Sequence, residues 1–122
     1  MQLYNQYKGW TRENDTAFTS KAHGRHKVHD YVNGLARSIF RASKGVYPTH
    51  SAVAKEGWMD GKRNMVWLME KRRPGFDKEH GDWWYATVDA QGKVANAGKV
   101  EACISCHDSA DNDYVFGLPG GN

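Results

Sequence analysis

The fold of this chain depends on one stretch near its middle, Asn64-Met65-Val66-Trp67-Leu68-Met69-Glu70-Lys71. Its side chains alternate between two faces, with Trp67 and Met69 on one face and Val66 and Leu68 on the other. This period of two is typical of a β-strand. Because both faces are largely apolar, the strand is expected to lie inside a sheet that is covered on both sides.

Two neighbouring stretches predict strands on either side of this one, in an antiparallel meander. Residues 51–57 alternate before it, with Val53 and Lys55 on one face, and residues 82–88 alternate after it. Asp60-Gly61 has the composition of a hairpin turn between the first two strands. Residues 27–32 also alternate and predict a fourth strand upstream.

The remaining segments predict little regular structure. Residues 35–43 have helical spacing and predict a short helix, with Asn33 as its N-cap and Gly45 at its end. Residues 12–22 are polar and weakly helical at best, and a loop is expected after the turn at 90–93. The predicted fold class is therefore α+β, mainly antiparallel β-sheet with a few short helices, in a single domain over residues 1–122.

The last fifth of the chain contains the motif Cys103-Ile104-Ser105-Cys106-His107. Two cysteines separated by two residues and followed by histidine are the attachment signature of a c-type haem. In one turn of helix both thiols can reach the haem vinyl groups, and the next residue places its imidazole under the iron. The motif predicts one haem c on a short C-terminal helix, bound covalently through Cys103 and Cys106, with His107 as the proximal metal ligand.

The same thiols could instead form a structural disulfide, a redox pair or half of a zinc site. A zinc site of the usual kind needs a second pair of soft ligands, and the chain has no other cysteine. A thioredoxin-like dithiol follows a strand and opens a helix near the start of the chain, whereas this motif lies in the last fifth of the chain. Covalent haem is the interpretation that uses both cysteines of the chain.

Composition excludes several other classes of protein. The net charge is +3 with acids and bases interspersed, and no basic stripe with interleaved aromatics indicates a nucleic-acid surface. No apolar run is long enough to span a membrane. Five tryptophans, six tyrosines and four phenylalanines suit a small protein that encloses a large flat apolar ligand.

Haem is attached to such motifs outside the cytoplasm, so we expect a periplasmic protein. The first residues, Met1-Gln2-Leu3-Tyr4, are followed by polar residues and lack the apolar region of a leader peptide. We therefore expect a mature or trimmed form of an exported protein.

The sequence also bears on the sixth ligand of the iron. The 15 residues after His107 contain no Met, His or Lys, so a second protein ligand must come from upstream or the site is open. Met65 and Met69, at strand spacing, are expected to be packing residues. Met59 and the histidines at 23, 26, 29, 50 and 80 are further candidates, and the histidines lie in polar stretches that predict exposed surroundings. An open, pentacoordinate haem is therefore expected.

Several segments of the chain together match the pattern of a known family. They are Tyr47-Pro48, Val53-Ala54-Lys55-Glu56, Met69-Glu70-Lys71-Arg72, Gly81-Asp82-Trp83-Trp84, the terminal haem motif and Asp113-Tyr114-Val115-Phe116. With them, residues 23–116 resemble the cytochrome P-460 family and its relative cytochrome c′-beta. The resemblance implies an antiparallel sheet with a few helices, a homodimer, and a five-coordinate haem open on its distal side.

The resemblance also assigns roles to two residues. A lysine of this family can bond covalently to the haem macrocycle, and by motif position that lysine is Lys55; the alternative is an ordinary strand lysine whose stem covers apolar surface. Trp67 aligns with the distal carboxylate of the hydroxylamine-oxidising members, and a bulky apolar residue there favours small neutral ligands such as NO. Glu70 and Glu56 could substitute for that carboxylate, although both fall on the opposite strand face.

These inferences lead to three candidate functions. The expected one is binding of a small gas such as NO at the open haem. The alternative is an enzyme that oxidises hydroxylamine or a related small nitrogen compound and passes electrons to a partner cytochrome. A simple electron carrier is the weaker alternative, because carriers generally keep both axial positions of the iron filled.

Overall fold

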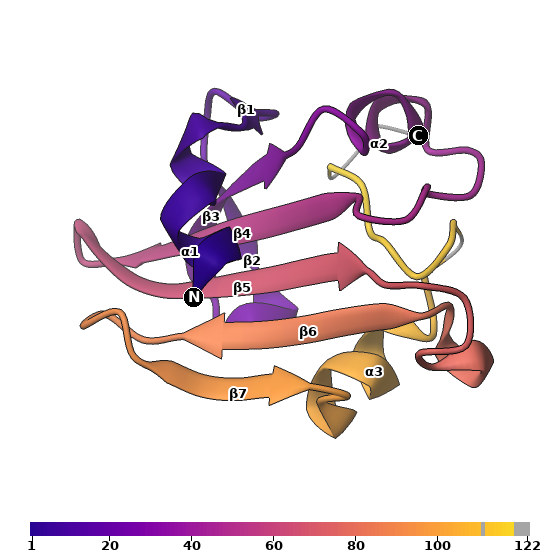
Figure 1. Cartoon of the computed structure of the whole chain (residues 1–122). Coiled ribbons are helices and arrows are strands. Elements are labelled where there is room, and N and C mark those ends of the chain that lie inside the picture. The colour runs from indigo at the N-terminus through magenta and orange to yellow at the C-terminus, as the bar shows by residue number, and fades with distance from the viewer. Residues whose placement is uncertain (111, 119–122) are drawn as a thin grey trace.

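The computed structural model describes residues 1–110 and 112–118 as one antiparallel sheet with short helices on both faces (Figure 1). The strands are β1 (Thr11–Arg12), β2 (Phe18–Ser20), β3 (His26–Val32), β4 (Ala52–Met59), β5 (Lys62–Lys71), β6 (Trp83–Val88) and β7 (Val94–Gly98). The α-helices are α1 (Gln2–Gln6), α2 (Arg37–Ala42) and α3 (Glu101–His107). Three 3-10 turns complete the elements: η1 (Tyr7–Gly9), η2 (Lys21–His23) and η3 (Lys78–His80).

Within these residues the seven strands follow the order β1-β3-β4-β5-β6-β7, and β2 also pairs with β3. The predicted α+β class and the predicted meander are both confirmed, with strand ends shifted by one or two residues. The turn between β4 and β5 has positive φ at both Asp60 (53°) and Gly61 (76°), which is the pattern of a type I′ hairpin. None of the described helices is long and apolar enough to cross a membrane.

Strand register places two predicted site residues, Lys55 and Trp67, in line with Asp30. Asp30 of β3 pairs with Lys55 of β4, and Lys55 pairs with Trp67 of β5. Residues that pair directly on adjacent antiparallel strands project to the same face of the sheet. Asp30, Lys55 and Trp67 therefore form one row across the sheet.

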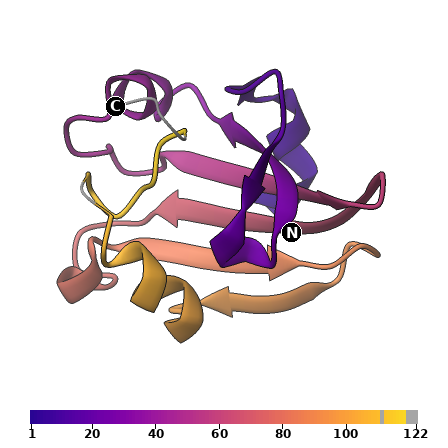
Figure 2. The ribbon, with the colours of Figure 1, turned by 180° about the vertical axis from the view of Figure 1, so that it is seen from behind.

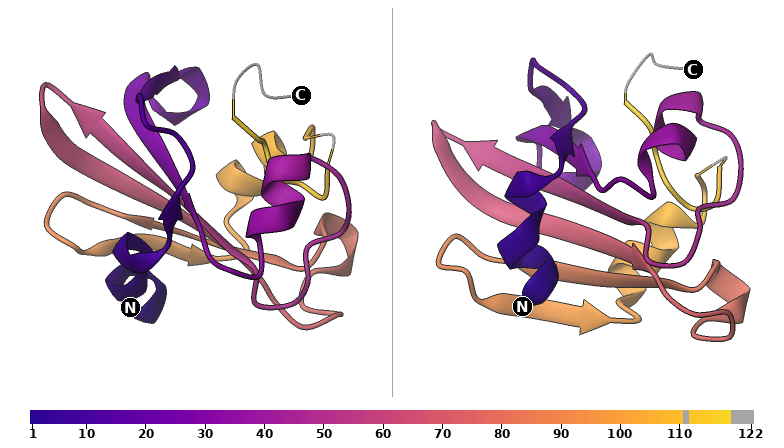
Figure 3. Two further views of the ribbon diagram at one scale, coloured as in Figure 1. Left: turned by 90° about the horizontal axis from the view of Figure 1, so that it is seen from above. Right: turned by 45° about the horizontal axis from the view of Figure 1, so that its top comes forward.

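The sheet is covered on both faces, as expected for a central strand that is apolar on both sides. On one face α1 and η1 pack over a core that includes Tyr7, Leu68 and Val88. On the other face lie α2, α3 and the C-terminal segment, over a core that includes Met69 and Trp83. Views from behind and from above show the elements that cover each face of the sheet (Figures 2 and 3). The β2–η2 segment lies on the same side as α3 (Figure 2).

The N-terminal residues contain more structure than the sequence predicts. Within residues 12–22, which were expected to be weakly helical at best, β2 and η2 form, and β1 includes Arg12. Both strands pair with β3, at Thr11 with Val32 and at Phe18 with Val28. The edge of β3 offers free backbone donors and acceptors, and this pairing outweighs weak local propensity.

The predicted helix over residues 35–43 is shorter in the structure. It begins at Arg37 after Ala36 and ends where Ser43 adopts a left-handed conformation (φ 52°), before Gly45. Asn33 is therefore not its N-cap. The Asn33 Oδ1 atom accepts hydrogen bonds from the backbone N–H groups of Ala36 (3.2 Å) and Ala52 (3.0 Å), so this side chain joins the entry of α2 to the start of β4.

The loop predicted after residues 90–93 is instead the edge strand β7, paired with β6. Its residues from Val94 to Ala97 are exposed, so they show no apolar alternation from which a strand could be predicted. Backbone hydrogen bonds pair it with β6, and the Asn96 Nδ2 atom also donates to Thr87 Oγ1 at 3.2 Å.

Gly57 of β4 provides a test of how tightly this sheet face is packed. A Cβ atom at Gly57 would lie 2.5 Å from Cζ3 of Trp67. The Trp67 ring also contacts His23 and His26, with centroids 4.6 and 5.3 Å away, so it has little room to retreat. We predict that Gly57→Ala lowers the free energy of unfolding by about 1–3 kcal/mol, measured by urea denaturation with tryptophan fluorescence.

Gly9→Ala is the matched control, because nothing lies within 4 Å of a Cβ at that position. We expect Gly9→Ala to change stability by about 0.5 kcal/mol or less. Equal stability of the two variants would contradict the close packing of Trp67 on Gly57.

Candidate haem site

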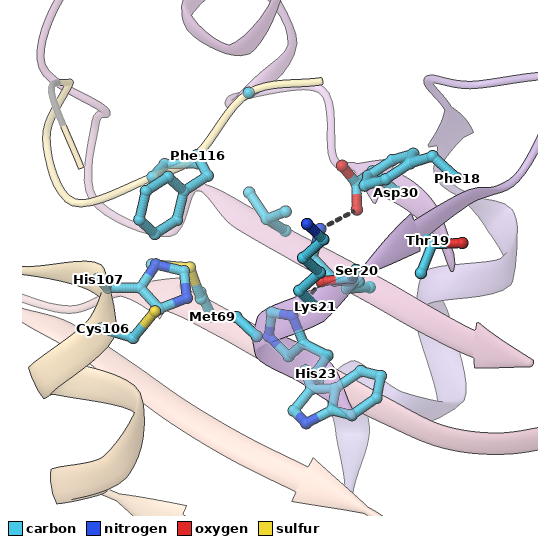
Figure 4. Close-up of a pocket in the computed structure, with 16 residues that line it drawn as sticks. Phe18, Thr19, Ser20, Lys21, His23, Asp30, Met69, Cys106, His107 and Phe116 are labelled. Carbon is cyan, nitrogen blue, oxygen red and sulfur yellow. Dashed lines mark hydrogen bonds and ion pairs between the residues drawn. The ribbon is translucent and has the colours of Figure 1, made fainter. Parts of the chain in front are cut away.

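A cavity of about 330 Å³ lies between α3, the β2–η2 segment and the strands β3 to β5 (Figure 4). Its apolar lining comes from Phe18, Val53, Trp67, Met69, Val115 and Phe116. Its main polar groups belong to His23, Asp30, Lys55, Cys106 and His107. A second hollow of about 190 Å³ shares His23, Trp67 and His107 with it and extends to Cys103. An apolar space with a few convergent polar groups is typical of a cofactor pocket.

Helix α3 places the two cysteines of the motif beside this space. The helix is anchored to the sheet by Ile104, which is buried in the core. Cys103 is half-buried and Cys106 is exposed, and both are free thiols. Residues three apart lie on one side of a helix, so both thiols are near the cavity and its adjoining hollow. Burial raises the pKa of the Cys103 thiol.

His107, the last residue of α3, is buried with a defined orientation. Its Nδ1 atom lies 2.7 Å from the carbonyl oxygen of Tyr114. A carbonyl only accepts, so Nδ1 carries the proton and Nε2 keeps a free lone pair. Burial lowers the pKa of His107, which favours the neutral ring. The ring is flanked by Tyr85 and Phe116, with centroids 5.4 and 5.2 Å away. A neutral, oriented imidazole is the form that binds iron.

Lys55 and Asp30 form an ion pair at the cavity wall. Lys55 Nζ lies 2.9 Å from Asp30 Oδ1, and the two side chains are 15% and 1% exposed. Within the described residues, Lys55 is the one side chain that contacts the Asp30 carboxylate closely enough to donate to it. Burial raises the pKa of Asp30, and the positive charge of Lys55 opposes that rise. The wall thus contains a buried carboxylate held mainly by charge.

His23 and Trp67 stand next to this pair. The His23 Nδ1 atom lies 2.8 Å from Ser20 Oγ, and burial, reinforced by the charge of Lys55, lowers the pKa of His23 to about 4. His23 is half-buried, and His26 is buried with its Nδ1 donating to the His23 carbonyl at 2.6 Å. The prediction of exposed surroundings is therefore wrong for both histidines, because η2 folds back over Trp67.

The predicted site residues lie around this space in the structure. Lys55, Trp67, Cys106 and His107 line the cavity, and Cys103 lines the adjoining hollow. Met69 is buried in the core, as expected, and also lines the cavity.

The two acids considered as substitutes for a distal carboxylate do not line the cavity. Glu56 accepts hydrogen bonds from Tyr7 (2.6 Å) and Trp58 (2.8 Å) in the layer under α1. Glu70 pairs with Arg72 at 2.8 Å. Both therefore lie on the opposite face, as their strand positions predict.

Sequence reasoning missed one polar residue of the cavity, Asp30, and it named His23 as a candidate ligand but predicted exposed surroundings for it. Asp30 had a detectable signal, since it is an acid between Val28 and Val32 on the apolar face of a predicted strand. A charge on such a face usually has a partner or a function. No comparable feature of the sequence indicated that His23 lines the cavity, because its position depends on the turn η2.

The donor set fits haem c. It provides an imidazole with a free Nε2, two free thiols one helical turn apart, and an apolar aromatic lining. These are the groups that a covalently attached haem requires from a protein.

Comparison with known proteins supports this assignment. No curated protein matches the chain at a significant level. The family model described as cytochrome P460 matches residues 4–117, from α1 to the segment after α3. This family implies a haem c cofactor. The match covers most of the chain, and the chain therefore belongs to the cytochrome P460 family.

Proposed function

We propose that the chain binds one haem c through thioether bonds to Cys103 and Cys106, with His107 as proximal ligand. We further propose that the pentacoordinate iron takes up a small neutral gas such as NO on its open distal side. The observation that best supports this is the His107 imidazole, fixed by the Tyr114 carbonyl with Nε2 free beside an apolar cavity. Haem iron, when bound, supplies the coordination site for the gas.

The charge balance of the cavity wall favours a neutral ligand. The Asp30 carboxylate is paired with the Lys55 ammonium at 2.9 Å, and Phe18 lies 5.1 Å from the same ammonium. Trp67 and Met69 make the adjacent wall apolar. A small uncharged molecule loses little hydration free energy when it enters such a space. A charged molecule would lose much more.

Oxidation of hydroxylamine or a related small nitrogen compound is the second candidate, and Asp30 supports it. A buried carboxylate whose pKa is raised can accept a proton closer to neutral pH than an ordinary aspartate can. Asp30, and neither Glu70 nor Glu56, is thus the acid on which this enzyme would depend. Lys55 lines the same cavity and remains the residue proposed for a cross-link to the haem. A partner cytochrome would accept the electrons.

The cellular location and the oligomeric state of the protein are predictions. Export to the periplasm follows from the chemistry of haem attachment, and the homodimer from the family resemblance. Cell fractionation and light scattering of the purified protein would test them.

The first prediction concerns haem attachment. Haem should stay with the protein through acid-acetone extraction, because thioether bonds survive denaturation. Replacing Cys103 or Cys106 with alanine should lower haem retention, and His107→Ala should change the absorption spectrum of the iron. Release of all haem from the unmodified protein would contradict covalent attachment.

The second prediction concerns the distal side of the iron. The ferrous protein should be high-spin and should bind NO or CO without displacing a protein ligand, as absorption and resonance Raman spectra would report. Met69→Leu and His23→Leu are the variants to compare, because both residues line the cavity. A low-spin ferrous spectrum that either variant abolishes would identify a sixth ligand and favour an electron carrier.

The third prediction separates gas binding from catalysis. The unmodified protein should bind NO and oxidise hydroxylamine only slowly with an artificial electron acceptor. Trp67→Glu should raise this turnover, since a carboxylate beside the iron can act as a general base. If Lys55 is cross-linked, Lys55→Arg should give the spectrum of an ordinary c-type haem.

The matched pair for this experiment is Asp30→Asn and Glu56→Gln, two buried acids on opposite faces of the sheet. NO binding should persist in both variants. Brisk hydroxylamine oxidation that falls about 100-fold in Asp30→Asn, and not in Glu56→Gln, would establish the enzyme instead.

A further inference from the structure

The carbonyl that orients His107 belongs to a tight turn in the segment after α3. The turn spans residues 112–115 and is closed by a hydrogen bond from Val115 N to Asn112 O (3.1 Å). Both central residues have positive φ, 47° at Asp113 and 66° at Tyr114. This is the pattern of a type I′ turn, in which glycine, asparagine or aspartate is usual. Tyr114 is none of these.

Two consecutive non-glycine residues with positive φ are strained, and such a conformation persists only where the surroundings hold it. The direction of the Tyr114 carbonyl depends on this conformation. Since that carbonyl accepts the hydrogen bond from His107 Nδ1–H, the orientation of the imidazole depends on the contacts that hold the turn.

Asp113 supplies much of that support through its carboxylate. Lys71, at the end of β5, donates to Oδ1 at 2.9 Å and to Oδ2 at 2.8 Å. The backbone N–H of Tyr47 also donates to Oδ2, at 2.9 Å. The Lys71 and Asp113 side chains are only 11% and 10% exposed, so solvent screens their attraction weakly.

Strand β6 and the loop before it hold the turn from another side. Trp83 Nε1 donates to the carbonyl oxygen of Asp113 at 2.8 Å, and the Lys71 ammonium lies 5.1 Å from the Trp83 ring. The Tyr114 ring packs on Gly81, where a Cβ atom would lie 2.5 Å from Cδ2 of Tyr114. Side chain and backbone of the turn are thus tied to several distant segments.

We propose that Lys71 and Asp113 are positioning residues for the proximal histidine. The pair holds the strained turn so that the Tyr114 carbonyl stays in line with His107 Nδ1. A close hydrogen bond at Nδ1 makes the imidazole a stronger donor to a metal, so the pair strengthens the bond between His107 and iron. The proposal rests on the proposed function, because it requires His107 to be the iron ligand.

A purely structural role is the competing explanation. Breaking a buried ion pair destabilises a protein wherever the pair lies, so loss of stability cannot distinguish the two. The chain offers a matched control on the opposite sheet face. Glu56 is 1% exposed and pairs at 2.8 Å with Lys8, which is 55% exposed, and its strand position puts it on the face opposite Lys55 and Trp67.

The experiment compares variants of the haem-loaded protein by resonance Raman spectroscopy of the ferrous form, with urea denaturation in parallel. Lys71→Met removes the ammonium at similar length, Asp113→Asn removes the charge of its partner, and Lys71→Arg keeps a cationic donor. The double variant Lys71→Met with Asp113→Asn leaves no unpaired buried charge and is the one to use if a single variant fails to fold. Glu56→Gln is the control.

We expect the iron–histidine stretching band to move to lower frequency in Lys71→Met, Asp113→Asn and the double variant, and to stay near its original position in Lys71→Arg. In Glu56→Gln the stability should fall while the band stays in place. An unchanged band in folded Lys71→Met, Asp113→Asn or double-variant protein would overturn the positioning role. Absence of an iron–histidine band in the unmodified protein would overturn the proposed function, and this inference with it.

Discussion

The cavity depends on the register between β3, β4 and β5. Asp30 opposite Lys55, and Lys55 opposite Trp67, put an acid, a base and an aromatic ring in one row. Side chains alternate with a period of two, so a slip of β4 by one residue would exchange its two faces. Lys55 would then point toward α1, and Glu56 would enter the cavity. The chemistry of the site is therefore decided by backbone pairing.

The register is fixed because both faces of the sheet are buried. On the side of α1, Glu56 is held by the Tyr7 hydroxyl and the Trp58 indole, a polar contact that a slipped strand would lose. On the other side, Ile104 packs into the core and anchors α3 there, which fixes the positions of Cys103 and Cys106. A slip would bury charged groups without their partners, at a cost of several kcal/mol.

These two constraints explain what the sequence could and could not predict. The strands on either side of Asp60-Gly61 were predictable because burial on both faces leaves a clear pattern, whereas β7 is exposed and leaves none. The haem motif is local and can be recognised in the sequence without knowledge of the fold. The position of Asp30 beside Lys55 needed the pairing of two strands, and the contact of Lys71 with Asp113 joins residues 42 positions apart. No local pattern encodes such distant contacts, because they arise only when the sheet has formed.

The balance between the two proposed functions, gas binding and oxidation, would depend on the charge beside Asp30. While Lys55 is a free ammonium, its charge opposes the rise in the Asp30 pKa that burial causes, and the pair is close to neutral. A lysine nitrogen bonded to the haem macrocycle no longer presents that free ammonium. Burial would then act on Asp30 without the opposing charge of Lys55, so the Asp30 pKa would rise further and the carboxylate would become a better proton acceptor. A cross-link at Lys55 would thus change the acid–base chemistry of the cavity as well as the spectrum of the haem.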